Sequence, residues 1–330
     1  MIFDSESVFE ENVITVLKQH GWKDGVLRYP TERDLLDNWK DILYRNNNDI
    51  DRLGKYPLTD GEMAQIIEQI ETLRTPLALN SFVNGRTVSI TRDNKEDVAH
   101  FGKEVSLYIY DRKEIAGGKS TYQIVQQPVY PAKNTMLSSR RGDLVLLING
   151  MPLIHIELKR SGIPVSQATN QIEKYAHEGV FTGLFRLVQI FVAMTPDDAV
   201  YFANPGADKF NPSYYFHWAD YNNEPICGGQ HPGKDEWKLF IGGTSGTAGL
   251  LSIPMAHQLI GFYTIADSAD GCLKVLRSYQ YLAANAISDV VRKCDWEQRP
   301  VTPGRPGGYV WHTTGSGKTM TQLQIGSAHC

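Results

Sequence analysis

The chain has 330 residues, enough for two domains or for one domain and part of a second. Hydrophobic residues make up 42% of the sequence, which excludes a chain that is disordered throughout. The formal net charge of -4 argues against a protein that coats nucleic acid non-specifically, although a local basic patch could still bind DNA.

The four cysteines are scattered and form no CxxC pair, so neither a disulfide framework nor a zinc site is indicated. Reduced thiols are usual in the cytoplasm. The first residues lack the basic and apolar regions of a signal peptide, and no apolar run approaches the roughly 20 residues that span a membrane. We therefore expect a cytoplasmic protein without a membrane partner.

The first third of the chain alternates between helical and strand patterns. An amphipathic helix is expected first, with Ser5 or Ser7 as its cap and Gly21 as its stop. Helical patterns and polar loops continue over residues 33–76. Alternation of apolar and polar residues then predicts three strands, at 86–91, 105–110 and 122–127.

The sharpest local pattern lies between residues 143 and 159. Two apolar runs, 144–148 and 153–158, flank Asn149-Gly150, a turn pair typical of a β-hairpin. A helix is expected to follow, from about residue 165 to 177. Two further strands are predicted around a Pro-Asp-Asp turn, at 187–194 and 199–203.

Flexible residues become frequent after about residue 226, where Gly-Gly, Pro-Gly and Gly-Gly-Thr-Ser-Gly runs occur. We predict a boundary there. It divides the chain into a first domain at 1–230, a flexible Gly-rich connection at 231–254 and the start of a second domain at 255–330. Within the last part, 273–291 has a helical pattern and 309–311 is expected to be a short strand.

Asp143, Glu157 and Lys159 interrupt the apolar strands of the predicted hairpin, where unpaired charges are costly. The two carboxylates could bind Mg²⁺, a hard cation that prefers oxygen ligands and that assists phosphodiester hydrolysis. Lys159 lies two residues after Glu157, so on a strand it points to the same face, where it could orient the attacking water or offset phosphate charge. Positive charge suited to a DNA backbone is added by Arg140, Arg141 and Arg160.

The hairpin register tests this site. A two-residue Asn149-Gly150 loop would pair Asp143 with Ile156, which would turn its side chain away from Glu157. A three-residue loop that includes Met151 would place Asp143 opposite Glu157. We therefore predict the three-residue loop, with Gly150 in a left-handed conformation.

Gln171 and Tyr175 lie one turn apart on the helix that follows the hairpin. Alone, they fit a partly buried polar pair on a helix surface, and charges such as Asp143 and Glu157 alone fit a solvated face. Their order along the chain, Asp-x13-Glu-x-Lys followed by Gln-x3-Tyr, favours an active site.

Residues 139–159 resemble the PD-(D/E)xK nuclease motif and, more narrowly, the restriction (motor) subunit of type I restriction-modification enzymes. The resemblance implies a restriction-endonuclease-like α/β core, with a mixed sheet flanked by helices. It further implies that Asp143 and Glu157 bind Mg²⁺, that Lys159 is catalytic, and that Gln171 and Tyr175 form the QxxxY motif of the nuclease, near the DNA.

Two details complete this resemblance. Gly142 stands where the motif name has Pro, but that Pro is not a metal ligand, so the departure puts little in doubt. An acidic residue of the first helix often joins such sites, which makes Glu10 and Glu11 candidates. A glutamate on a helix surface is the commoner explanation for either residue.

Residues 312–319, His-Thr-Thr-Gly-Ser-Gly-Lys-Thr, are expected to follow a strand and open a helix. Gly-rich turns let backbone N–H groups approach phosphates, and a helix N-terminus favours anions. His312 occupies the place of the first Gly of the strict pattern, and a plain Gly-Ser turn beside a Lys is the alternative. ATP would be contacted by Gly315, Ser316, Gly317, Lys318 and Thr319, the last through Mg²⁺.

This loop resembles motif I of superfamily 2 helicases, and Gln280 resembles the glutamine upstream of motif I that binds adenine. A polar residue on an amphipathic helix explains Gln280 equally well. The chain ends eleven residues after Thr319, without a Walker B strand or a second RecA-like lobe. We therefore expect an incomplete RecA-like P-loop lobe, an N-terminal piece of a longer subunit, and weak or absent ATP binding by this piece.

The resemblance implies Mg²⁺-dependent endonucleolytic cleavage of double-stranded DNA, coupled in the full-length subunit to ATP-driven DNA translocation. The implied partners are the methylation and specificity subunits of a type I complex. Two alternatives stay open: a DNA-repair nuclease-helicase with the same motifs, and a non-catalytic assembly module with a vestigial site.

Overall fold

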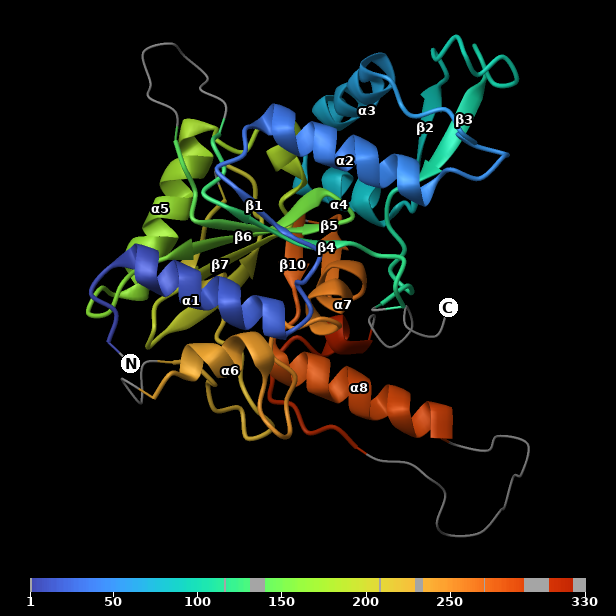
Figure 1. The fold of residues 1–330 in the computed structure, drawn as a ribbon. Coiled ribbons are helices and arrows are strands. Elements are labelled where there is room, and N and C mark those ends of the chain that lie inside the picture. Colours follow the sequence, from blue (N-terminus) through green and yellow to red (C-terminus); the bar gives the residue numbers. More distant parts are fainter. Residues whose placement is uncertain are drawn as a thin grey trace, which may run out of the picture.

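A six-stranded mixed sheet forms the centre of the computed structural model, in the order β1-β4-β5-β6-β7-β8 (Figure 1). The pairs β1/β4 and β6/β7 are parallel and the other three pairs are antiparallel. These strands are β1 Val26–Arg28, β4 Tyr122–Gln126, β5 Leu144–Ile148, β6 Met151–Leu158, β7 Ile190–Met194 and β8 Ala199–Ala203. The structure describes residues 2–115, 117–130, 140–207, 209–228, 234–269, 271–293 and 309–322.

Helices cover both faces of this sheet, which confirms the predicted α/β class. On β7, Phe191 and Ala193 pack with Ile172 of α5, whereas Ile190 and Val192 face the other way and belong to the larger core with α1. In a strand, such alternate residues point to opposite faces. The helices around the sheet are α1 Glu6–Gln19, α2 Glu32–Asn46, α3 Asp60–Thr72, α4 Pro76–Asn84 and α5 Val165–Glu178. Within the described ranges, no helix has the length and apolar character needed to cross a membrane.

The first helix begins and ends where the sequence predicts. Ser5 caps α1 by accepting a hydrogen bond from the Val8 N–H, and Glu6 lies in the first turn, where a negative charge is favourable. Gly21 follows the helix with φ +107, a value that L side chains rarely adopt. A Cβ at Gly21 would lie 2.6 Å from Cβ of Ile253, so the chain can turn here only at a glycine.

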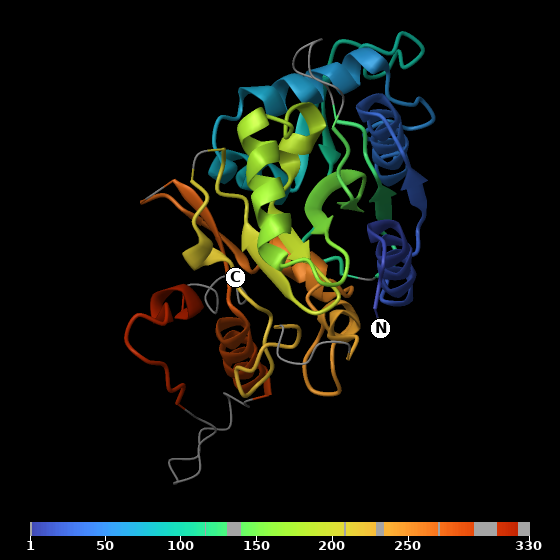
Figure 2. The same cartoon turned by 90° about the vertical axis from the view of Figure 1, so that its left-hand side faces the viewer.

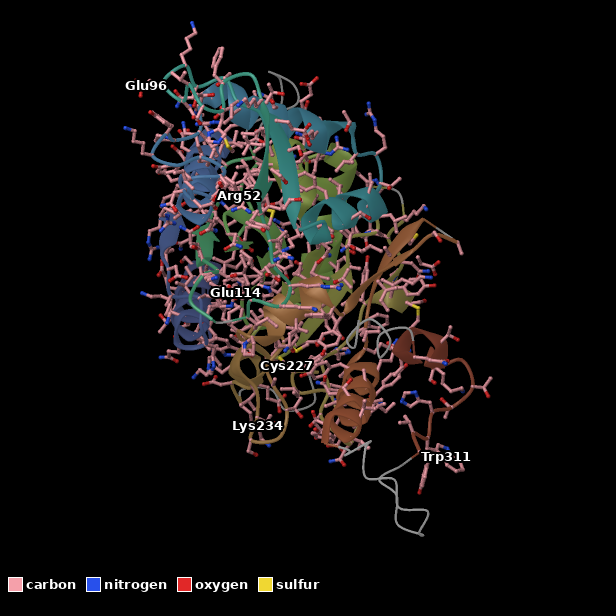
Figure 3. All side chains as sticks on the ribbon, turned by 90° about the vertical axis from the view of Figure 1, so that its right-hand side faces the viewer. Arg52, Glu96, Glu114, Cys227, Lys234 and Trp311 are labelled. Atoms are coloured by element: carbon pink, nitrogen blue, oxygen red, sulfur yellow. The ribbon has the colours of Figure 1, made fainter. Side chains whose placement is uncertain are left out.

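The strands predicted in the first third of the chain are also present. β2 Thr87–Thr91 and β3 Glu104–Tyr108 form a separate antiparallel pair, and the third predicted strand is β4 of the central sheet. The connection between β2 and β3 carries Glu96 to one end of the molecule (Figure 3).

The β5–β6 hairpin does not have the predicted three-residue loop. Ile148 pairs with Met151, so the loop contains only Asn149 and Gly150, with φ of +53 and +83. The left-handed conformation predicted for Gly150 is confirmed, and two positive φ values suit an Asn-Gly hairpin turn.

A β-bulge then shifts the register. Leu147 pairs with Pro152 but Leu146 pairs with Ile154, which leaves Leu153 as an extra residue in β6. Pro152 has no N–H to donate, and proline within a sheet is tolerated at such irregular positions. Beyond the bulge Leu144 pairs with Ile156, so the next pair along the hairpin is Asp143 and Glu157. The predicted pairing is therefore present, although the predicted loop is wrong.

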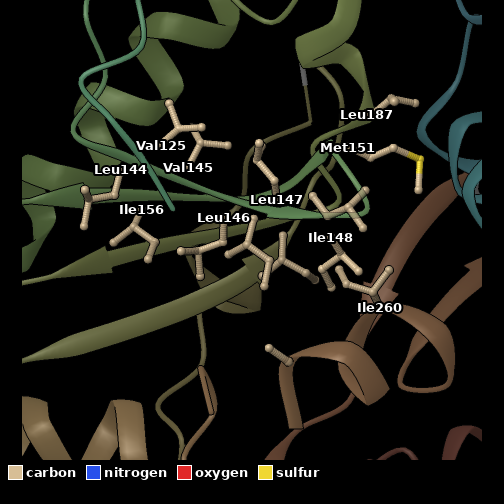
Figure 4. Close-up of a cluster of buried hydrophobic side chains, with 14 of the residues drawn as sticks. Val125, Leu144, Val145, Leu146, Leu147, Ile148, Met151, Ile156, Leu187 and Ile260 are labelled. Carbon is tan, nitrogen blue, oxygen red and sulfur yellow. The ribbon is translucent and has the colours of Figure 1, made fainter. Parts of the chain in front are cut away.

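The strand β5 is buried on both faces, because every residue from Leu144 to Ile148 is fully buried. Figure 4 shows Val145 and Leu147 on one side of the strand and Leu146 and Ile148 on the other. This burial explains why the sequence of β5 is a continuous apolar run rather than an alternating one.

The segment predicted as a flexible connection folds onto the core in its described part, residues 234–254. Trp237 and Leu251 are fully buried, and the indole Nε1 of Trp22 donates to the Leu251 carbonyl at 2.6 Å. Trp237 also packs edge-on against Phe9 of α1. The prediction follows the glycine-rich composition and does not weigh the buried residues Trp237 and Leu251. The helix α6 Glu236–Gly242 lies in this segment, and α7 Met255–Gly261 follows it.

The helical pattern predicted at 273–291 splits into a strand and a helix. β9 Thr264–Asp267 pairs with β10 Cys272–Val275, and α8 Ser278–Lys293 follows. Figure 2 shows α8 and residues 309–322 at the end of the molecule remote from α2 and α3.

The strand expected at 309–311 is not formed, since none of the described strands pairs with it. Trp311 is 86% exposed and projects away from the molecule (Figure 3). A single strand without a partner leaves its backbone groups unpaired, so it has no reason to hold an extended conformation. Residues 318–322, after the Gly-rich loop, are helical as predicted.

Candidate functional site

The acidic pair lies where β5 begins and β6 ends. Glu157 is fully buried, and Asp143 Oδ2 accepts a hydrogen bond from the Leu158 backbone N–H at 2.7 Å. Burial raises the pKa of both carboxyls, and the charge of Glu157 raises the pKa of Asp143 further. Two carboxylates held together in an apolar interior therefore favour either a shared proton or a cation between them.

Lys159 joins this pair on the same face, as predicted. Its Nζ lies 3.2 Å from Glu157 Oε1 and 3.7 Å from Glu6 Oε1, and it donates to the Leu158 carbonyl at 2.9 Å. Burial alone would lower the pKa of Lys159, but Glu157 and Asp143 outweigh burial and raise it. The ammonium group therefore stays charged beside the carboxylates.

The first helix contributes Glu10 rather than Glu11 to this cluster. Glu10 is only 2% exposed, and its Oε2 accepts from Gln127 Nε2 at 3.1 Å. Burial raises the pKa of Glu10, and the charge of Asp143 adds to this effect. Glu11 instead pairs with Arg28 at 2.6 Å, and this contact lowers the pKa of Glu11. Of the two glutamates that the sequence offers as candidates, Glu10 is therefore the one near Asp143.

Three buried polar atoms at this cluster have no hydrogen-bond partner among the described residues: Glu10 Oε1, Glu157 Oε2 and His155 Nε2. Buried polar atoms without partners are costly, and oxygens of this kind are the ligands that a hard cation takes. Among the described residues, no group of three or more acidic, His or Cys side chains is arranged as a ready metal cluster. The buried oxygens of Glu10 and Glu157, together with Asp143, are the kind of donor that Mg²⁺ accepts, since this ion binds through one or two carboxylates and keeps several waters.

Sequence reasoning missed His155, which is fully buried beneath this cluster. Its Nδ1 lies 3.0 Å from the hydroxyl of Tyr130, and its Nε2 lies 3.5 Å from Glu157 Oε2. Burial lowers the pKa of His155 to about 4. Its position two residues before Glu157, on the same face of β6, was the available signal.

Gln171 and Tyr175 of α5 contact each other and bind the backbone that leads into Asp143. Gln171 Nε2 donates to the Tyr175 hydroxyl at 2.6 Å, and this hydroxyl donates to the Arg141 carbonyl at 2.8 Å. Burial raises the pKa of Tyr175, so the hydroxyl keeps its proton. The helix is thus tied to the backbone two residues before Asp143.

The basic residues around the acidic pair are differently engaged. Arg140 forms two hydrogen bonds of 2.9 Å with the Glu178 carboxylate, and the guanidinium of Arg141 lies 6.0 Å from the ring centre of Tyr29. Arg160 is exposed. Arg141 and Arg160 therefore offer positive charge beside the cluster.

The Gly-rich loop forms a second, separate assembly. Gly315 and Gly317 have φ of +79 and +76, and Lys318 Nζ donates to the Thr313 carbonyl at 2.9 Å. Ser316 is partly buried and Thr319 is exposed.

Gln280 of α8 contacts this loop directly. Its Nε2 donates to the carbonyls of Ser316 and Gly317, each at 3.1 Å, and the Tyr279 hydroxyl also donates to Ser316, at 2.8 Å. A cavity of about 230 Å³ opens beside them and is lined partly by Arg277 and Met320. The structure therefore brings Gln280 to the predicted phosphate loop.

A mixed sheet whose central hairpin carries an acidic pair and a lysine on one face has the fold of a restriction-endonuclease-like domain. A family model described as type I restriction enzyme R protein N terminus matches residues 4–210, so the chain belongs to this family. A second model, described as SWI2/SNF2 ATPase, matches residues 279–328. This second match fits the beginning of a helicase lobe.

The chain is also similar to curated endonuclease subunits of type I restriction enzymes. It is 30% identical over 330 residues to the SsaAORF53P subunit of Staphylococcus saprophyticus and 30% identical over 326 residues to the SauMSSORF170P subunit of Staphylococcus aureus. Both matches cover 98% of this chain and 30% of the relative, so the chain spans about a third of the length of these relatives. The EcoprrI endonuclease subunit of Escherichia coli is 26% identical over 343 residues, which cover 94% of this chain and 99% of that relative.

Proposed function

We propose that this chain carries the DNA-cutting site of a type I restriction subunit and hydrolyses phosphodiester bonds of double-stranded DNA with Mg²⁺. The observation that carries the proposal is the convergence of Asp143, Glu157 and Lys159 on one face of the hairpin, with Glu157 Oε2 left unpartnered. The similar endonuclease subunits support the same role.

Asp143 and Glu157 would hold the metal ion, with Glu10 at its edge through the unpartnered Oε1. When bound, Mg²⁺ supplies positive charge to the scissile phosphate and acidifies a water molecule. Lys159, cationic and 3.2 Å from Glu157 Oε1, is placed to orient that water or to offset charge on the phosphate. Gln171 and Tyr175 hold the Asp143 strand in place.

The decisive experiment is plasmid cleavage with Mg²⁺ by the assembled restriction complex, with Lys159→Ala in the subunit. We expect cleavage to be lost. Lys238→Ala is the control, because Lys238 pairs with Asp235 on a different part of the surface. Equal cutting by the Lys159 variant and the parent would refute the catalytic role and favour the alternative of a vestigial site.

We further propose that the DNA partner is shared with methylation and specificity subunits, and that the protein works in the cytoplasm. Co-purification with a methyltransferase separates this reading from a DNA-repair nuclease-helicase. A repair enzyme would be isolated without a methyltransferase.

We also propose that residues 1–230 form the endonuclease domain, and that a RecA-like lobe begins at about residue 255. Its phosphate loop would bind ATP through Gly315, Ser316, Gly317, Lys318 and Thr319, with adenine near Gln280 and the cavity beside it. The match to SWI2/SNF2 ATPases supports this assignment. Coupling of cleavage to DNA translocation would belong to the full-length subunit.

We expect the 330-residue chain to bind ATP weakly or not at all, because the side chains of Lys318 and Gln280 already donate hydrogen bonds within the chain. Lys318 donates to Thr313 and Gln280 to the Ser316 and Gly317 carbonyls. Titration with a fluorescent ATP analogue measures this affinity. Micromolar binding would show that these contacts open readily for the nucleotide and would contradict the expectation.

A further inference from the structure

Beneath the acidic pair lies a second, wholly buried pair, Tyr130 and His155. The Tyr130 hydroxyl is 3.0 Å from His155 Nδ1, and on the opposite side of the ring His155 Nε2 is 3.5 Å from Glu157 Oε2. Neither His155 Nε2 nor Glu157 Oε2 has a hydrogen-bond partner among the described residues. Two buried polar atoms thus face each other at slightly more than hydrogen-bond distance, and contacts at catalytic sites often shorten when the ligand arrives.

We propose that His155 is a positioning residue for Glu157, with Tyr130 holding the imidazole in the tautomer whose Nε2–H points at Glu157 Oε2. This inference rests on the proposed function, because its purpose is to aim the Glu157 carboxylate at a metal ion. One oxygen of Glu157 is held by Lys159, and the other would be held by His155. A residue behind a metal ligand commonly fixes the ligand's orientation in this way.

The tautomer follows from the two neighbours of the ring. If the Tyr130 hydroxyl donates to Nδ1, the imidazole proton is on Nε2 and faces a carboxylate, which is favourable. If Nδ1 carried the proton instead, the Nε2 lone pair would face the lone pairs of an ionised Glu157, which is repulsive. With Glu157 ionised, the Nε2–H tautomer is therefore the one that satisfies both sides of the ring.

Gly142 makes room for this pair. A Cβ at Gly142 would lie 2.6 Å from the Tyr130 hydroxyl oxygen and 3.0 Å from His155 Cε1, distances that real Cβ atoms hardly ever show. Gly142 is also the position where the nuclease motif has Pro. Tyr130 and His155 thus occupy the space that a Pro ring at this position would need. Gly142 is therefore the residue that permits the buried pair.

His257 provides an internal reference elsewhere in the core. Its Nδ1 lies 2.9 Å from the Tyr122 hydroxyl and its Nε2 lies 3.0 Å from the Asp111 carbonyl. Because a carbonyl oxygen can only accept, the proton of His257 is on Nε2 and the Tyr122 hydroxyl donates to Nδ1. His257 and Tyr122 therefore form a second buried His–Tyr pair, whose tautomer follows from its partners and which does not contact Asp143 or Glu157.

The first test is the nitrogen NMR spectrum of the metal-free 330-residue chain, labelled with ¹⁵N at histidine, at pH 9, above the folded-state pKa of Glu157 and Asp143. We expect the resonances of His155 to report the same Nε2–H tautomer as those of His257. Tyr130→Phe should leave His257 unchanged and mix the tautomers of His155. A His155 ring protonated at Nδ1 in the parent would overturn the proposal.

The second test is the affinity for Mn²⁺, measured by calorimetry. His155→Leu should weaken binding about 10-fold or more, the usual effect of removing a group behind a metal ligand. His155→Gln, which returns an N–H near the place of Nε2, should restore most of that affinity, whereas a purely structural role would not distinguish the two variants.

His257→Leu is the matched control, since it removes a buried histidine with a tyrosine partner and should leave Mn²⁺ affinity unchanged. Equal affinity of His155→Leu and the parent would overturn the positioning role. Glu157→Gln separates this failure from that of the proposed function: if it binds Mn²⁺ as the parent does, the metal site itself is wrong, and the tautomer measurement still decides His155.

Discussion

Asp143 lies opposite Glu157 because Leu153 is an extra residue in β6, which offsets the two-residue Asn149-Gly150 turn. Without that bulge, the same turn would pair Asp143 with Ile156 and separate the carboxylates onto two faces. The two-residue turn sets one register at Ile148 and Met151, and the Asp143–Glu157 pairing needs a register shifted by one residue. The bulge between them supplies that shift.

The stability of the metal-free protein should fall as pH rises. Burial raises the folded-state pKa of Asp143 and Glu157 above the unfolded values of about 4, so their contribution is fully present at acidic pH and is lost as the pH rises through the folded-state values. Urea unfolding at pH 5.5 and pH 8 measures this trend. Addition of Mg²⁺ at pH 8 should restore stability, because a bound cation favours the ionised pair.

Asp143→Asn should remove most of this pH dependence and be more stable than the parent at pH 8 without metal. Asp60→Asn is the control, because Lys40 and Arg33 lower the pKa of Asp60 to about 2 at an exposed position. A parent protein that gains stability between pH 5.5 and pH 8 would contradict the electrostatic account of the pair.

Neighbouring glutamates of α1 should differ sharply in metal binding. Glu10→Gln should weaken Mn²⁺ binding about 10-fold, since Glu10 Oε1 is buried and unpartnered near Asp143, whereas Glu11→Gln should change it by less than about twofold. Calorimetric titration of both variants measures the difference. If Glu11→Gln were the weaker binder, the assignment of Glu10 would fail.

Tyr175→Phe should reduce DNA cleavage by the assembled complex and cost about 1 kcal/mol in unfolding free energy, because the hydrogen bond to the Arg141 carbonyl is lost. Tyr215→Phe is a matched control, since its hydroxyl donates to Glu173 on the same helix at 2.6 Å. Unfolding and plasmid cleavage are measured together. Similar cleavage losses in the two variants would mean that Tyr175 supports the helix rather than the site.

Trp237→Ala should destabilise the nuclease domain by about 3–5 kcal/mol, as for other fully buried tryptophans. Its indole packs against Phe3 and Phe9, so a chain cut after residue 230 should also expose this cluster. Denaturant unfolding followed by tryptophan fluorescence tests both. A chain of residues 1–230 with unchanged stability would show that the later segment is dispensable.

The sequence predicts the convergence of Asp143, Glu157 and Lys159 because these charges break apolar strands at positions that a local motif defines. It does not predict the bulge at Leu153, whose effect depends on pairing with β5, although Pro152 marks an irregular position. The sequence does not predict a role for His155, because a histidine within an apolar run resembles an ordinary core residue.

Other errors come from patterns that fit two structures. Leu273 and Val275 alternate as in a strand but also begin the helical pattern of 273–291, so the pattern predicts a helix where the structure has β10. Glycine-rich composition between residues 231 and 254 suggested a flexible connection. Burial of Trp237, Phe240 and Leu251 arises from contacts more than two hundred residues distant in sequence, as the bond between Trp22 and Leu251 illustrates.

The packing of α6 on α1 brings residues after 230 close to the helix that carries Glu10. Phe9 and Glu10 are consecutive residues: the ring of Phe9 packs edge-on against Trp237, and the buried Glu10 carboxyl is near enough to Asp143 for the charge of Asp143 to raise its pKa. The contact that packs α6 on α1 is therefore one residue away from a buried carboxylate of the acidic cluster.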